Sequence, residues 1–263
     1  MTALLRVEHV SKSFGGVHAL DGCTVEVDEG TITGLIGPNG SGKTTLFNVI
    51  TGYERVDSGD VFMGGTKITN APAQRAFSLG IGRTFQLTRI FPRLTVMENM
   101  LLAAHHRSRG QGQAGSRTRN PLARAGGTAD RRHAMELLEF TGIAGYATAL
   151  AGTLSYGQRK LLELSYVLAA EPVIVLLDEP AGGVNPSLVN HISGRIREMN
   201  RQGTTFLVVE HNMEFVMGLC DAVTVLDYGT VVATGPPEII RNDPRVLDAY
   251  LGMAEEDDDA SSE

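Results

Sequence analysis

Eight consecutive residues near the N-terminus constrain the fold more than any other feature of the chain. Segment 37–44 reads GPNGSGKT and has the spacing GxxxxGK[ST] of a phosphate-binding loop. It follows a short apolar strand predicted over 32–36, and it precedes a helix that we expect to begin near Thr44 and to end before Gly52. Because a chance match rarely has a strand before it and a helix after it, the segment predicts a phosphate-binding α/β core.

The loop residues have distinct expected roles toward a nucleotide. Glycines let backbone N–H groups approach phosphate oxygens, and the following helix adds the positive end of its dipole. Lys43, one of only four lysines in the chain, supplies a charge for the β- and γ-phosphates, and the Thr44 hydroxyl can ligate Mg²⁺. The predicted nucleotide-binding residues here are Gly37, Pro38, Asn39, Gly40, Ser41, Gly42, Lys43, Thr44 and Thr45.

A second apolar strand, predicted over 173–177, ends in two acidic residues. Its continuous apolar run is typical of a parallel strand buried on both faces, and ligands bind at the carboxyl ends of such strands. Asp178 can hold Mg²⁺ directly or through water, and Glu179 can polarise the attacking water. Acids after a strand also often cap the next helix, but together with the phosphate loop they favour a nucleoside triphosphatase.

The pentapeptide LSYGQ at 154–158 comes shortly before that strand and opens an apolar-periodic helix. Taken alone, it also fits a plain helix N-cap at Ser155. It resembles the signature motif of ATP-binding cassette (ABC) ATPases, usually LSGGQ, from which Tyr156 departs. The resemblance implies that this helix N-terminus, through Ser155, Gly157 and Gln158, binds the γ-phosphate of ATP held by a second subunit.

Further positions match the same family in chain order. The resemblance implies that Phe14 stacks on adenine, that Gln86 contacts Mg²⁺ and water, and that His211 contacts the γ-phosphate. Residues 181–186 follow the acid pair as the family's D-loop does, although Asn185 stands where many members have Asp, which leaves the cross-subunit contact open. The resemblance covers residues 4–252, assigning Glu179, His211 and Gln86 to catalysis and Thr44, Gln86 and Asp178 to the metal.

The expected fold is an α/β P-loop ATPase core with an antiparallel β subdomain and an inserted helical subdomain, in a single ATP-binding domain over 4–252. Alternating patterns at 5–14 and 23–27 predict strands of the antiparallel part. Beyond residue 171 the α/β pattern resumes, with strands expected at 204–209 and 223–226 and helices at 186–201, 212–219 and 245–251.

The helical insertion is expected at about 90–170, where helical spacing occurs at 96–106 and 130–141. Between these helices, residues 107–128 are rich in Gly and Arg and have no apolar periodicity, which predicts an exposed loop. The acidic residues at 253–263 predict a disordered tail.

Finer motifs resemble the ATP-binding subunits of branched-chain amino acid importers, and among them the longer of that importer's two ATPases. Urea importers carry a close relative, so the ATPase of a urea, amide or other amino acid importer stays an alternative. The resemblance implies ATP and Mg²⁺ as cofactors, and it implies membrane permease subunits and a second ATPase subunit, identical or not, as partners. The motifs lie at 13–17, 80–86, 91–96, 210–214, 242–245 and 249–252.

Bulk properties exclude other classes of protein. The net charge of −7 is concentrated in the acidic tail, so the rest of the chain is nearly neutral and no nucleic-acid partner is expected. Cys23 and Cys220 lack metal-type spacing and predict buried free thiols in a reducing cytosol. Because no apolar run approaches the ~18 residues of a membrane span and no signal-peptide pattern is present, we expect a cytoplasmic protein that docks peripherally on the inner face of the cell membrane.

An ABC ATPase that acts on DNA is the remaining alternative. Such a protein would need a long coiled coil between the halves of its head, and the segment between Gln86 and Leu154 shows no sustained heptads. The arginine-rich stretch at 107–128 also lacks the interleaved aromatic residues that stack on bases.

An apolar cluster after Gln86 has two interpretations. Ile90, Phe91 and Leu94 can pack against the helices of the insertion itself. Alternatively, as the transporter resemblance implies, they form a cleft, rimmed by arginines, for a short cytoplasmic helix of the membrane subunit.

Overall fold

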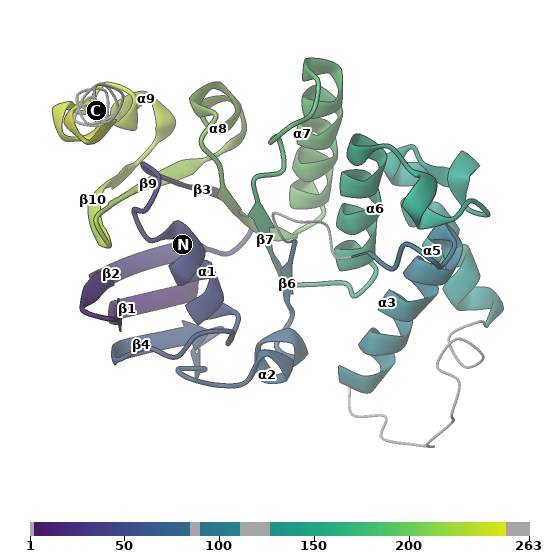
Figure 1. Ribbon diagram of the computed structural model, residues 1–263, viewed down its shortest axis with the longest axis horizontal. Helices are drawn as coiled ribbons and strands as arrows, with labels where there is room; N and C mark the ends of the chain where they lie inside the picture. The colour runs from purple at the N-terminus through teal and green to yellow at the C-terminus, as the bar shows by residue number, and fades with distance from the viewer. Residues whose placement is uncertain (1–2, 85–89, 111–126, 251–263) are drawn as a thin grey trace. The chain divides into compact units, whose positions relative to one another are not determined.

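The structure is a computed structural model of the 263-residue chain, and it describes residues 3–84, 90–110 and 127–250 (Figure 1). The chain divides into two compact units. The first unit combines the residues up to Ala76 with those from Thr205 onward, and the second consists of residues 77–204.

The first unit contains a four-stranded antiparallel sheet in the order β2-β1-β4-β5. Apolar residues that alternate along β1 and β2 fill its core, as predicted; Leu5, Val7 and Val27 are fully buried. β2 begins earlier than expected because shifts in the register of the β1–β2 pair interrupt the alternation before Cys23. The bounds are β1 (Ala3–Phe14), β2 (Val17–Asp28), β4 (Ser58–Met63) and β5 (Thr66–Lys67).

The same unit contains strands in the order β10-β9-β3-β8. β3 pairs in parallel with β8 and with β9, whereas β10 pairs antiparallel with β9. Every residue of β3 and β8 is buried, which explains their continuous apolar sequences. β10 was not predicted, because its small and polar residues give no clear period. The bounds are β3 (Ile32–Ile36), β8 (Thr205–Val209), β9 (Ala222–Asp227) and β10 (Thr230–Gly235).

Short helices complete the first unit. Leu46, Phe47 and Ile50 of α1 are buried in the core. The Asn212 side chain caps α8 by accepting a hydrogen bond from the Phe215 N–H at 3.0 Å. The bounds are α1 (Lys43–Ile50), α8 (Met213–Leu219) and α9 (Pro237–Ile240), with residues 244–250 also helical. A further helix, α2 (Ala73–Ser78), crosses the boundary between the two units.

The second unit is mainly helical. Its described residues include strands β6 (Ile81–Arg83) and β7 (Ile174–Asp178), which pair in parallel. Helix α5 contacts both α3 and α6, and the fully buried Met100, Leu138 and Leu162 come from these three helices. The helix bounds are α3 (Val96–Gly110), α5 (Thr128–Thr141), α6 (Tyr156–Leu168) and α7 (Pro186–Arg201), with 3₁₀ turns at Ala144–Tyr146 and Ala151–Thr153.

Helix α3 continues to Gly110, a few residues into the segment predicted as a loop. The extension has a simple cause, since arginine is a strong helix former even without an apolar stripe. The remainder of the predicted loop, at 111–126, lies outside the described residues, and so does the predicted acidic tail.

Two predictions from composition can be compared with the structure. Cys23 and Cys220 are both buried and free, as predicted. Within the described residues, no helix is both long enough and apolar enough to cross a membrane.

Candidate nucleotide site

The phosphate loop in the first unit follows directly from the buried strand β3. Gly37 and Gly42 have φ angles of 149° and 103°, which other residues rarely adopt. A Cβ atom at Gly37 would lie 1.9 Å from the Leu226 carbonyl oxygen, and one at Gly42 would lie 2.4 Å from that of Ala19. Both positions therefore require glycine for space as well as for conformation.

Lys43 folds back over this loop. Its Nζ donates hydrogen bonds to the carbonyl oxygens of Gly37 and Pro38, at 2.8 and 2.6 Å, and to the Ser41 hydroxyl at 3.1 Å. Gly42 caps α1 without a side-chain hydrogen bond, so the N–H groups of the first helical turn suit an anionic ligand. The exposed Thr44 hydroxyl lies in the same turn. These features fit the phosphates of a nucleotide.

Phe14 and His211 are also in the first unit, and both side chains are accessible. Phe14, at the end of the β1–β2 hairpin, is 45% exposed, and the Lys12 Nζ lies 4.8 Å from its ring centroid. The His211 side chain, which follows β8, is 63% exposed, and its Nδ1 lies 3.9 Å from the Glu210 carboxylate. Glu210 is itself fully buried and accepts a hydrogen bond from the His211 N–H at 3.2 Å, so it orients this segment.

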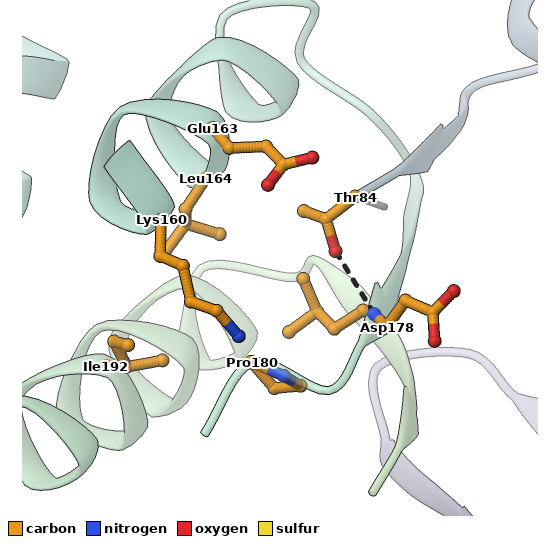
Figure 2. A pocket seen from close by; sticks show the side chains of 8 residues that line it. Thr84, Lys160, Glu163, Leu164, Asp178, Pro180 and Ile192 are labelled. Atoms are coloured by element: carbon orange, nitrogen blue, oxygen red, sulfur yellow. Dashed lines mark hydrogen bonds between the residues drawn. The ribbon is translucent and has the colours of Figure 1, made fainter. Parts of the chain in front are cut away.

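In the second unit, Asp178 ends β7 in a buried ion pair. Its Oδ2 lies 3.3 Å from Nη2 of Arg83, and the two side chains are only 7% and 6% exposed. The Asp178 N–H donates to the Thr84 hydroxyl at 3.1 Å (Figure 2). Burial raises the pKa of Asp178 above its ordinary value, and the Arg83 guanidinium opposes that shift.

Glu179 follows at the strand's end with a left-handed backbone, φ 49°, which is uncommon for a residue other than glycine. Its carbonyl oxygen accepts hydrogen bonds from the Lys160 Nζ and from the Gly182 N–H, the latter at 3.1 Å. Strained backbone of this kind clusters at functional sites. Glu179 as a whole is only partly buried.

The LSYGQ segment forms a complete capping box at the start of α6. Ser155 Oγ accepts from the Gln158 N–H at 3.3 Å, and Gln158 Oε1 accepts from the Ser155 N–H at 2.9 Å. The N-cap interpretation of Ser155 therefore holds, and it leaves the exposed helix N-terminus suited to an anion. Gly157 packs closely against α7, because an added Cβ would lie 2.3 Å from Leu188 Cδ2 and that side chain would have to move. Asn185 caps α7 in turn, accepting from the Leu188 N–H at 2.9 Å.

The structure brings together some of the predicted site residues and not others. The phosphate loop, Phe14 and His211 belong to the first unit, whereas the acid pair and the LSYGQ segment belong to the second. Gln86 lies outside the described residues, and so does Arg89, one of the arginines expected to rim the apolar cluster around Phe91. Among the described residues, no cluster of three or more His, Cys, Asp or Glu side chains could hold a metal ion.

Sequence reasoning missed three charged residues. Arg83 and Glu210 lie within the motifs at 80–86 and 210–214, which assign neither residue a role. Lys160 carried one usable signal, since it is one of four lysines in a chain dominated by arginine. The contacts of Arg83 and Lys160 are with residues distant in sequence, such as Asp178 for Arg83, whereas Glu210 contacts the adjacent His211.

Comparison with known proteins identifies the class to which this fold and loop belong. A family model described as "ABC transporter" matches residues 20–182, so the chain belongs to the ABC transporter family of ATP-binding proteins. A second model, described as "Branched-chain amino acid ATP-binding cassette transporter", matches residues 230–252.

Curated relatives cover nearly the whole chain. The high-affinity branched-chain amino acid transport ATP-binding protein LivG of Salmonella typhimurium is 38% identical over 252 residues, which are 95% of this chain and 98% of LivG. The corresponding protein BraF of Pseudomonas aeruginosa is 36% identical with the same coverage of both chains. These matches confirm the predicted subgroup resemblance.

Solved structures agree with this assignment. The ADP conformation of an ATP-binding cassette of an ABC transporter is 35% identical, with a TM-score of 0.82 over 96% of this chain and 100% of that chain. A nucleotide-free cassette gives a TM-score of 0.81 at the same identity, over 95% and 99% of the two chains. The predicted fold class is therefore confirmed, and the chain is a nucleotide-binding ATPase of this family. The roles assigned to individual site residues stay predictions.

Proposed function

We propose that this ATPase hydrolyses Mg·ATP to energise the import of branched-chain amino acids. The main support for this substrate class is the match of residues 230–252 to the branched-chain amino acid family model, in addition to the general match at 20–182. Relatives named as branched-chain amino acid transport ATP-binding proteins, which cover 95% of the chain, support it further. Both favour this substrate class over urea or amides.

The residues of the first unit bind and orient the nucleotide. The backbone of the loop at 37–44 and the Lys43 ammonium hold the phosphates, and Phe14 stacks on the adenine. His211 contacts the γ-phosphate. The geometry of Lys43 supports its role, since the ammonium is already drawn over the loop by three oxygens.

The acid pair Asp178 and Glu179 supplies the remaining groups proposed for hydrolysis. Thr44, Asp178 and Gln86 are the proposed ligands of Mg²⁺, which neutralises charge on the phosphates when bound. Glu179 polarises the attacking water and accepts its proton on the carboxylate. The constrained backbone of Glu179 supports this role, because a positioned base is more effective than a mobile one.

A second ATPase subunit supplies the other half of each site. Ser155, Gly157 and Gln158 bind the γ-phosphate of ATP held by that subunit, which is either identical to this chain or closely related. An open groove of about 600 Å³ passes the LSYGQ segment and the start of α7, within the second unit, and gives a phosphate access to the α6 N-terminus.

Permease subunits dock at the apolar cluster around Phe91, which places the chain peripherally on the inner face of the membrane. The Phe91 side chain is 49% exposed, so it is not part of the local core. Its backbone is held by Asn99, which is fully buried: Asn99 Oδ1 accepts from the Phe91 N–H at 2.8 Å and Nδ2 donates to the Phe91 carbonyl at 3.1 Å. A rigidly held, exposed aromatic side chain suits an interface.

The proposal is tested by purifying the chain with its membrane partners and measuring ATP hydrolysis with a panel of solutes and their binding proteins. We expect leucine, isoleucine or valine to stimulate hydrolysis and urea to leave it unchanged. Stimulation by urea alone would replace the proposed substrate class. Stimulation by DNA, without co-purified membrane subunits, would favour an ABC ATPase that acts on nucleic acid.

A further inference from the structure

Lys160 connects α6 to the end of β7 within the second unit. It lies on α6, four residues after Tyr156, and its Nζ donates a hydrogen bond to the carbonyl oxygen of Glu179. Figure 2 shows the side chain running from α6 toward Pro180, the residue after Glu179. The contact is therefore with the backbone of the proposed general base, and it comes from the helix that the LSYGQ segment begins.

The backbone of Glu179 needs such an anchor. A left-handed conformation is unfavourable for a residue with a side chain, and it persists only where the surroundings hold it in place. The Glu179 carbonyl oxygen accepts from the Lys160 ammonium and from the Gly182 N–H. Because a charged donor makes a stronger hydrogen bond than a neutral one, Lys160 contributes much of this restraint.

Tyr156 adds a second contact between the same two segments. The Lys160 Nζ lies 5.5 Å from the centroid of the Tyr156 ring, within the range of a cation–π interaction. The ring also packs on the loop after Glu179, since a Cβ added at Gly183 would lie 3.1 Å from Tyr156 Cε1. The tyrosine that departs from the common LSGGQ motif therefore contacts both Lys160 and this loop.

The surroundings of Lys160 are confined, and polar and apolar side chains both contribute to them. Its side chain lines a cavity of about 20 Å³, together with Thr84, Glu163 and Asp178 (Figure 2). Glu163 and Asp178, which share this lining, are nearly fully buried. A lysine that is half-buried in such a place is held more firmly than one on the surface.

We propose that Lys160 is a positioning residue that ties the backbone of Glu179 to the LSYGQ end of α6. The inference rests on the proposed function, from which the roles of Glu179 and of the LSYGQ segment come. In a dimer of cassettes, the LSYGQ segment serves ATP bound by the partner subunit, whereas Glu179 serves ATP bound by its own chain. Through this link, ATP that the partner subunit holds against the LSYGQ segment influences the position of Glu179, the base at this chain's own ATP site.

The test compares Lys160→Met, which removes the charge, with Lys160→Arg, which retains a donor. Lys67→Met serves as the matched control, because Lys67 is an exposed lysine that pairs with Asp60 in the first unit. We expect Lys160→Met to lower kcat by about 10- to 100-fold, the loss typical of a reacting group displaced by about 1 Å, while ATP affinity stays within about twofold. Lys160→Arg should recover most of the turnover, and Lys67→Met should match the parent.

Hydrogen exchange supplies a readout that is independent of turnover. In Lys160→Met the amide of Gly182 should exchange faster, while the amides of β3 and β8 stay protected. Normal kcat with unchanged exchange at Gly182 would overturn the proposal. Equal losses of turnover, ATP affinity and melting temperature, not restored by arginine, would also overturn it, because they indicate a packing role only. A parent protein that does not hydrolyse ATP would instead refute the proposed function.

Discussion

Replacing Gly42 by alanine should destroy the phosphate loop, whereas the same substitution at Gly40 should leave it largely intact. Both glycines lie in the loop and both have positive φ angles, 103° and 79°. They differ in the space around them: a Cβ at Gly42 would lie 2.4 Å from the Ala19 carbonyl oxygen, while a Cβ at Gly40 meets nothing within 4 Å. The pair therefore separates the conformational cost of alanine from its steric cost.

The two costs can be estimated separately. At Gly40 the only cost of alanine is the left-handed conformation, which lowers the free energy of unfolding by about 1–2 kcal/mol. This corresponds to a fall of roughly 2–8 °C in melting temperature for a chain of this size. At Gly42 the overlap must also be relieved by a shift of about 1 Å, and overpacking of this kind typically costs a further ~1–3 kcal/mol. Because Lys43 is the next residue, the shift also displaces its ammonium from the phosphates, which should weaken ATP binding about 10- to 100-fold.

Thermal unfolding and equilibrium binding of a fluorescent ATP analogue measure both effects on the same samples. Gly40→Ala should keep ATP affinity within about tenfold of the parent, which is less than the shift expected from a lost charge-assisted contact. Gly42→Ala should lose both stability and affinity. Parental affinity in Gly42→Ala, or equal damage from the two substitutions, would show that the spacing between Gly42 and Ala19 does not control the loop.

Three further predictions concern other parts of the chain. Glu179→Gln should keep ATP affinity, lower turnover roughly 10²–10⁴-fold and sediment as an ATP-bound dimer; normal turnover would exclude Glu179 as the base. Phe91→Asp should abolish pull-down of the permease subunits while ATP binding by the isolated chain stays unchanged; loss of both together with a lower melting temperature would place Phe91 in the core. Burial raises the pKa of Cys23 and Cys220 to about 12, so both native thiols should resist alkylation at pH 8. Because these thiols ionise first in the unfolded chain, the free energy of unfolding should fall between about pH 9 and 12, by about 1.4 kcal/mol per pH unit per thiol; rapid alkylation of the native protein would contradict this.

The elements that could be predicted are those with a strong local signal. The bounds of β3 follow from its continuous apolar run and the glycine after it. Helix α7 occupies the predicted residues 186–201, because the Asn185 cap and a proline in the first turn mark its start. The N-cap at Ser155 was likewise predicted from the pentapeptide alone.

Features without a local signal were missed. β10 pairs with β9 although its own residues show no period, and α3 runs beyond its apolar stripe. The contacts of the acid pair depend on distant partners: Arg83 is 95 residues from Asp178, and Lys160 is 19 residues from Glu179. The spacing of a motif can identify the residues of a site. The side chains that position those residues can be identified only from the folded structure.

Uptake of labelled leucine into vesicles that contain the reconstituted transporter, with ATP on the side of this chain, tests the central claim most directly. Lys43→Ala provides the control, because it removes the main side-chain partner of the phosphates. The proposed function predicts leucine accumulation that requires Mg·ATP with the parent chain and none with Lys43→Ala. ATP-dependent accumulation of urea without leucine, or equal leucine uptake by the parent and Lys43→Ala, would contradict it.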